Sequence, residues 1–115
     1  MQATWKGWAV SGPQWVPTID DSKVHDGAYV PVYPKGVGVL LVRTDGELFA
    51  IANKCAHMAC PLEGGELNGH VITCPCHDWR FDVRSGQFLD APELSIDTFA
   101  TKLEDGKVLV ELKGA

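Results

Sequence analysis

The sequence has little positive charge. It contains 10 Lys and Arg residues against 15 Asp and Glu residues, so its formal net charge is -5 with neutral histidines. This deficit argues against binding to nucleic acid, whose phosphates require a basic face. It also argues against an anionic membrane surface. A protein partner with a basic docking patch is favoured instead.

Long apolar runs are missing as well. No run approaches the ~20 residues that a membrane-spanning helix needs, and the N-terminal ten residues lack the basic-then-apolar arrangement of a secretion signal. We therefore expect a soluble, cytoplasmic protein without a membrane span. The 115 residues, of which 45% are hydrophobic, are enough for one domain around one core.

Internal repeats, low-complexity tracts and clear amphipathic helical periodicity are also absent. Short β-rich runs followed by turn residues recur instead, and this pattern is typical of a small all-β domain. Thr44-Asp45-Gly46 and Glu104-Asp105-Gly106 each predict a hairpin. We expect strands at 5–10, 29–33, 37–43, 48–52, 71–74, 79–83, 87–89, 98–103 and 107–112, and one helical turn at 20–24.

The composition changes at Asn53. From there to Pro92 the chain is rich in Gly, Pro, Cys and His and poor in long apolar runs. Such a composition indicates an inserted loop region that something other than a hydrophobic core holds in place. We therefore expect one domain, with an antiparallel base of about 3–52 and 93–113 and an insertion of about 53–92.

No cysteine lies outside this insertion, which argues against a disulfide-stapled secreted domain whose cysteines close several loops. The 4 cysteines lie between Cys55 and Cys76, and two of the 4 histidines fall in the same stretch. Cys55-Ala56-His57 forms a C-x-H box, and after 16 intervening residues Cys74 begins a C-x-x-H box that ends at His77. Two short boxes on two loops suit a metal centre, because each box supplies two donors.

A Cys/His pair in each box fits two kinds of centre. One is a tetrahedral zinc site with two Cys and two His ligands. The other is a two-iron cluster with thiolates on one iron and imidazoles on the other. The residues favour iron, because the C-x-H spacing is unusually short for structural zinc. In addition, Cys60 and Cys76 have no obvious role in a four-ligand zinc site.

Both boxes resemble those of the Rieske iron–sulfur family. CAHMAC at 55–60 is similar to the family's C-x-H-x-x-C, and CPCHDWRFD at 74–82 is similar to its second box, continued into the W-R-F-D run of the soluble ferredoxin branch. The resemblance implies an all-β Rieske fold, in which a small antiparallel β-sandwich or barrel base carries an inserted cluster-binding subdomain. It also implies a Rieske-type [2Fe-2S] cluster as the cofactor.

The same resemblance implies roles for single residues. Cys55 and Cys74 would hold one iron, and His57 and His77 would hold the other. Cys60 and Cys76 match positions where some members form a disulfide between the two loops, and Pro92 lies where the family places a third loop over the cluster. Other residues expected to shield or neighbour the cluster are Met58, Pro75, Asp78 and Trp79. Gly64-Gly65 is expected to let the first loop turn tightly.

The residues after His77 predict a modest reduction potential. Rieske centres lie at roughly -150 to +300 mV, because their two neutral imidazoles leave the oxidised cluster with no net charge, against about -400 mV for all-cysteine clusters of the plant type. High-potential members place hydroxyl donors after the second histidine. Here Asp78-Trp79-Arg80-Phe81 follow, with no hydroxyl among them. We therefore predict a potential in the lower half of the Rieske range.

The resemblance implies one-electron transfer from a flavoprotein reductase to a terminal oxygenase or similar oxidoreductase. No residue set indicates a catalytic nucleophile or an acid–base pair, so we expect an electron-transfer protein without catalytic residues of its own rather than an enzyme. Two alternatives stay open. One is a Rieske subunit of a larger oxidoreductase, nitrite-reductase-like or arsenite-oxidase-like. The other is a redox-sensing domain whose signal is the cluster or the Cys60–Cys76 pair.

Overall fold

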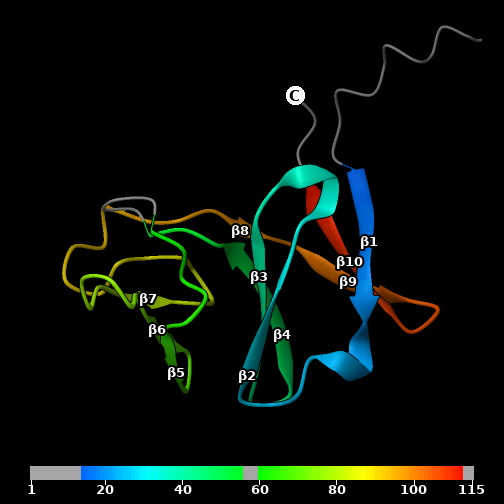
Figure 1. Ribbon diagram of the computed structural model, residues 1–115, viewed down its shortest axis with the longest axis horizontal. Coiled ribbons are helices and arrows are strands. Elements are labelled where there is room, and N and C mark those ends of the chain that lie inside the picture. Colours follow the sequence, from blue (N-terminus) through cyan, green and yellow to red (C-terminus); the bar gives the residue numbers. More distant parts are fainter. Residues whose placement is uncertain (1–13, 56–59, 113–115) are drawn as a thin grey trace, which may run out of the picture.

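The computed structural model of the chain describes residues 14–55 and 60–112 (Figure 1). Nearly all of its regular structure is β-strand, with two short 3-10 turns. The elements in chain order are β1 Gln14–Asp20, η2 Asp21–Lys23, β2 Ala28–Val32, η3 Pro34–Gly36, β3 Val39–Thr44, β4 Glu47–Ala52, β5 Glu66–Asn68, β6 Val71–Thr73, β7 Arg80–Asp82, β8 Thr98–Phe99, β9 Thr101–Glu104 and β10 Lys107–Leu112.

Within these residues the strands form three antiparallel sheets. Their strand orders are β1-β10-β9, β2-β3-β4-β8 and β5-β6-β7. The first two sheets lie together on one side of the molecule, and the third lies beside them in a separate lobe (Figure 1). The structure thereby confirms the predicted all-β antiparallel fold. None of the helical turns in the described part of the chain has the length and apolarity to cross a membrane.

β3 occupies the centre of this arrangement because both of its faces are apolar. Val39 and Leu41 point into the core between the two larger sheets, and Leu40 and Val42 point into a second core beneath the β5-β6-β7 lobe. All four side chains are fully buried. A continuous apolar run of this kind is typical of a strand covered on both faces. The second core also contains Ile51, Cys55, Leu62, Ile72, Cys74, Phe81, Val83, Phe88 and Ile96.

Most of the expected strands are present with shifts of one or two residues at their ends. The strand expected at 98–103 is interrupted at Ala100, where the chain passes from the four-stranded sheet (β8) to the three-stranded one (β9). Asp21–Lys23 forms the expected helical turn. The strand expected at 5–10 lies outside the described residues. The division into a base of 3–52 and 93–113 and an insertion of 53–92 stays a prediction.

One predicted strand is absent, and two observed strands were not predicted. No strand forms at 87–89, where only the isolated bridges Phe81–Phe88 and Gln87–Ser95 occur. The tight turn at Gly86 and the turn that begins at Leu89 leave too few residues between them for a ladder. Conversely, β1 and β5 were not expected. β1 contains Pro17 and forms on the edge of its sheet, a position that tolerates proline.

Candidate metal centre

The first box begins where β4 ends. Asn53 and Lys54 lead from β4 to Cys55, whose side chain is only 2% exposed. The Cys55 amide donates a hydrogen bond to the carbonyl oxygen of Cys60 at 2.7 Å. The two ends of the CAHMAC segment are therefore held together by the backbone. His57 and Met58, which the sequence analysis placed at the cluster, lie outside the described residues.

The second box forms a loop closed by its own backbone. Cys74 directly follows β6 and is 0% exposed. Its amide donates to the Trp79 carbonyl at 2.7 Å, and its carbonyl accepts from the Asp78 amide at 3.0 Å. Asp78 has a φ of 59°, in the left-handed region that Asp tolerates better than most residues. The loop presents Pro75, His77 and Asp78 to solvent, while the Cys74 thiol stays buried.

A disulfide joins the two boxes. It links Cys60 to Cys76, whose Cα atoms lie 6.6 Å apart, within the usual range for disulfides. The sulfur atoms of Cys60, Cys74 and Cys76 lie within 4.8 Å of one another. The buried Cys74 sulfur is therefore beside the cross-link, at the point where the two loops meet. Cys55 and Cys74 stand outside the disulfide.

Aromatic side chains anchor the second loop to the core. The Trp79 ring stacks on Phe88 with a centroid separation of 4.0 Å and an interplanar angle of 3°. Phe81, which is fully buried, lies 6.4 Å from Trp79 and 5.7 Å from Phe88 between ring centroids. These large aromatic side chains bury a substantial apolar area against one another, which stabilises the fold. Trp79 is thus a packing residue that holds the end of the loop.

The third loop, which contains Pro92, runs along the second. It is tied to β7 by hydrogen bonding between the Leu89 amide and the Arg80 carbonyl, at 2.9 Å. The Arg80 guanidinium also lies 3.5 Å from the Asp90 carboxylate. Within the loop, the Leu94 amide donates to the Ala91 carbonyl at 2.9 Å and closes a turn in which Pro92 is exposed.

The Gly64-Gly65 pair forms the tight turn that the sequence predicts. Gly64 has a φ of 96°, and the Gly65 amide donates to the Leu62 carbonyl at 2.9 Å. A positive φ at the third turn residue is the signature of a type II turn. Side chains of Tyr29 and Asn53 hydrogen-bond to the same turn. Sequence reasoning missed both residues, because these contacts join positions far apart in the chain.

The charged groups beside the site have separate roles. Asp78 and Asp90 are exposed carboxylates on the second and third loops, and the nearby Arg80 guanidinium offsets part of the charge of Asp90. Asp82 instead holds the turn after β7. Hydrogen bonds from the Arg84 side chain, at 2.9 and 3.0 Å, lower the pKa of Asp82 and keep its carboxylate ionised.

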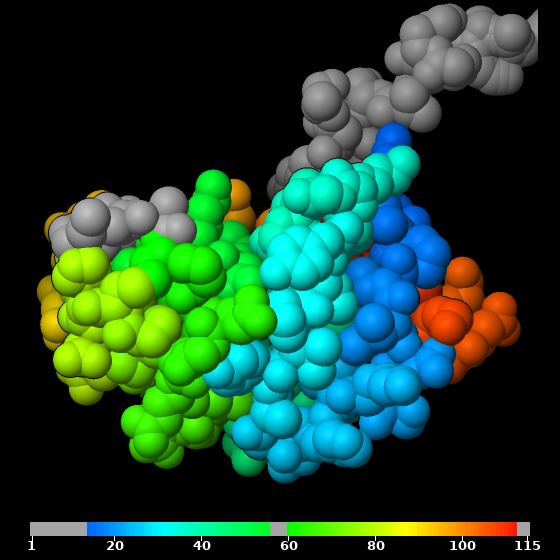
Figure 2. All heavy atoms as spheres, viewed as in Figure 1, coloured from blue at the N-terminus to red at the C-terminus, as the bar shows by residue number. Residues whose placement is uncertain are grey.

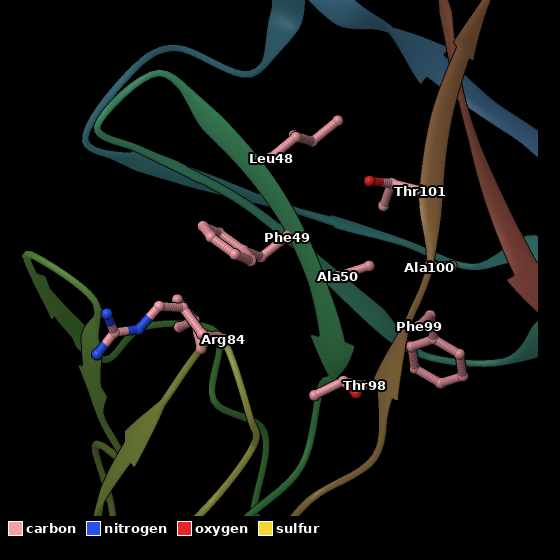
Figure 3. A pocket seen from close by; sticks show the side chains of 9 residues that line it. Leu48, Phe49, Ala50, Arg84, Thr98, Phe99, Ala100 and Thr101 are labelled. Atoms are coloured by element: carbon pink, nitrogen blue, oxygen red, sulfur yellow. The ribbon is translucent and has the colours of Figure 1, made fainter.

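The loops lie at one end of the molecule. Figure 2 shows the residues of the second box at the end of the long axis opposite the β9–β10 hairpin. A cleft of about 380 Å³ lies elsewhere, between β4 and the β8–β9 segment (Figure 3). Among the described residues that line it there is neither cysteine nor histidine, and the Arg84 guanidinium points away from β9. This cleft therefore adds no donor to the metal centre.

The donor set fits an iron–sulfur cluster. Cys55 and Cys74 are two buried thiols of one apolar cluster, and thiolates are the ligands that iron–sulfur clusters prefer. His77 adds an imidazole on the same closed loop as Cys74, at the solvent side. This separation of buried sulfur from exposed nitrogen matches a centre with two chemically different irons.

The chain belongs to the Rieske [2Fe-2S] domain family, because residues 14–100 match the sequence pattern of that family. Its cofactor is a Rieske-type [2Fe-2S] cluster. Within that family it is similar to ferredoxins. It is 33% identical to the ferredoxin component of the naphthalene 1,2-dioxygenase system of Pseudomonas putida, over 86% of this chain and 96% of the relative.

Solved structures show the same likeness. The ferredoxin of Sphingomonas yanoikuyae B1 superposes with a TM-score of 0.77 and 29% identity, over 86% of this chain and 99% of that chain. The terminal oxygenase of carbazole 1,9a-dioxygenase from Novosphingobium sp. KA1 superposes with a TM-score of 0.81 and 26% identity, over 89% of this chain. This chain spans only 30% of that oxygenase chain, so the likeness is confined to one part of the oxygenase.

Proposed function

We propose that the chain carries single electrons from a flavoprotein reductase to a terminal oxygenase or similar oxidoreductase, in the cytoplasm, and that it has no catalytic activity of its own. The observation that carries this proposal is the pair of cross-linked loops, which bury two thiols beside an exposed imidazole at one end of the molecule. The relationship to a dioxygenase ferredoxin component over nearly the whole chain supports it.

The proposed ligands divide between the two irons by residue type. Cys55 and Cys74 would hold one iron, and His57 and His77 would hold the other. Burial of both thiols and exposure of His77 support this assignment. When bound, the cluster supplies a single-electron redox couple. The protein contributes a rigid frame, because hydrogen bonds close the ends of both boxes and the disulfide joins them.

The surface around His77 suits a partner with a basic rim and an apolar centre. Asp78, Asp90 and Glu93 are exposed carboxylates on the second and third loops, and Pro92 and Leu94 are exposed apolar residues on the third loop. Interfaces commonly combine an apolar centre with a charged rim. Complementary charge at such a rim accelerates association more than it raises affinity.

Stopped-flow spectroscopy tests the proposed carrier role. The oxidised holoprotein is mixed with a flavoprotein reductase and NADH, and the reduced form is then mixed with a terminal Rieske oxygenase. We expect reduction and then reoxidation by one electron per chain, with rates that fall steeply as salt is added, because the docking surface is acidic. The proposal would be contradicted if the protein accepted no electron from any flavoprotein reductase tested, or passed none to any Rieske oxygenase tested.

The reduction potential gives a second, independent prediction. In a titration followed by electron paramagnetic resonance (EPR), we expect a midpoint in the lower half of the roughly -150 to +300 mV Rieske range. Asp78→Asn should raise this midpoint by on the order of 50 mV, because it removes one negative charge near the centre. Asn is the appropriate replacement, since it also tolerates the left-handed conformation at this position. A wild-type midpoint above roughly +150 mV would contradict the prediction.

A further inference from the structure

Side chains from outside the first loop hold the turn at its far end. The Tyr29 hydroxyl donates to the Gly65 carbonyl at 2.6 Å and accepts from the Gly64 amide at 2.9 Å. The Asn53 side-chain oxygen accepts from the Glu63 amide at 3.0 Å. Three consecutive residues of the turn are thus bound by two side chains that lie 10 to 36 positions away in the sequence.

Tyr29 and Asn53 both belong to, or directly follow, strands of the four-stranded sheet. Tyr29 is on β2, opposite Val42 on β3, and Val42 is opposite Phe49 on β4. Cross-strand neighbours share a face, and all three residues pack into the core beneath the β5-β6-β7 lobe. Asn53 directly follows β4, and its amide donates to the Gly38 carbonyl at 3.1 Å. The sheet therefore presents two fixed polar groups to the turn.

The Gly64-Gly65 turn also contacts β6, the strand that leads into the second box. A Cβ atom at Gly65 would clash with the Thr73 carbonyl oxygen, so the two backbones are in direct contact there. Thr73 immediately precedes Cys74. The disulfide joins the two boxes on one side, and the Gly65–Thr73 contact joins the segments behind them on the other side.

We propose that Tyr29, together with Asn53, is a positioning residue for the iron–sulfur centre: it clamps the Gly64-Gly65 turn to the sheet and so limits the opening of the two loops that releases the cluster. This inference rests on the proposed ligand assignment. Tyr29→Phe removes two hydrogen bonds, of which each contributes modestly to stability. Opening of the loops should therefore become about tenfold more frequent.

The test compares Tyr29→Phe with Tyr33→Phe. Tyr33, the only other tyrosine in the chain, follows the same strand and is 61% exposed, so its variant loses the same atom outside the clamp. Cluster loss from each holoprotein is followed by visible absorbance in excess EDTA, and amide hydrogen exchange is measured at Glu63, Gly64 and Leu40. For Tyr29→Phe we expect about tenfold faster cluster loss and exchange at Glu63 and Gly64, with exchange at Leu40 unchanged.

Further measurements distinguish a clamp on the loops from a general contribution of Tyr29 to the stability of the domain. Tyr29→Phe should broaden the EPR signal of the reduced centre, because looser loops allow a wider spread of geometries, whereas Tyr33→Phe should not. Equal rates of cluster loss for the two variants would overturn the inference. So would equal acceleration of exchange at Leu40 and Gly64, since this would mean that Tyr29 merely stabilises the whole domain.

A second pair of variants keeps the test decisive if Tyr29→Phe does not fold. Asn53→Ala removes the acceptor for the Glu63 amide, and Asn53→Asp retains an oxygen at the same place. We expect faster cluster loss for Asn53→Ala and rescue by Asn53→Asp; equal rates for the pair would overturn the clamp. Amide exchange requires no electron transfer, so its result stands apart from the outcome for the proposed carrier function.

Discussion

Replacing Cys74 with serine is expected to abolish cluster incorporation and to give a colourless protein with almost no bound iron or acid-labile sulfide. The Cys74 thiol is completely buried and lies beside the cross-link between the two loops. A thiolate is a soft, anionic donor that iron–sulfur clusters require, and a serine hydroxyl resists the deprotonation that ligation needs. Iron and sulfide assays, together with the visible spectrum after anaerobic purification, provide the measurement.

The matched control removes the other two sulfurs. Cys60→Ser with Cys76→Ser eliminates the disulfide but keeps both proposed thiolate ligands. This double variant should retain the cluster while losing about 3 kcal/mol of stability, because the cross-link closes a loop with a sequence separation of 16. A coloured Cys74→Ser protein with full iron content would show that the thiolate ligands are assigned wrongly. A colourless double variant would instead show that the cross-link itself is needed to retain the cluster.

Gly86→Ala is expected to cause a large loss of stability, because strain and a backbone clash coincide at this position. Gly86 has a φ of 80°, which costs an alanine roughly 1–2 kcal/mol. Its carbonyl also accepts a hydrogen bond from the Ile96 amide at 2.9 Å, and an added Cβ would clash with the Ile96 carbonyl oxygen. We expect the free energy of unfolding to fall by about 3 kcal/mol in urea titrations.

Gly106→Ala separates backbone strain from the clash. Gly106 has nearly the same conformation, with a φ of 78°, but a Cβ there meets nothing within 4 Å. This variant should lose only about 1 kcal/mol. If the two variants lost equal stability, the close approach between Gly86 and Ile96 would have no energetic weight, and the prediction would be wrong.

The parts of the fold that the sequence predicted depend on local chemistry. Both hairpins form as expected: Thr44 pairs with Glu47, and Glu104 pairs with Lys107. In each hairpin an Asp-Gly pair occupies the two turn positions with positive φ. Such turns are specified by the residues inside them, so a single sequence is enough to place them.

The parts that were missed depend on distant partners. β1 forms because Gln14 pairs with Leu112, at the other end of the chain. Its own residues alternate only weakly between apolar and polar, and Pro17 disfavours a strand in the absence of an edge position. The short strand β5 likewise exists because it pairs with β6. Nothing local to either segment indicates that partner.

The candidate site divides in the same way. The spacing of the Cys/His boxes pointed to a metal centre, and their resemblance to a known family implied the Cys60–Cys76 bond that the structure contains. The roles of Tyr29 and Asn53 were beyond sequence reasoning. Their side chains reach the Gly64-Gly65 turn only because the sheet and the lobe pack face to face.

The double burial of β3 couples the two halves of the molecule thermodynamically. Leu40 and Val42 belong to the core under the metal loops, while Val39 and Leu41 belong to the core between the larger sheets. Detachment of the lobe would bare one side of this strand to water and leave the remaining sandwich short of apolar cover. Unfolding of the whole lobe is therefore expected to be coupled to unfolding of the rest of the domain.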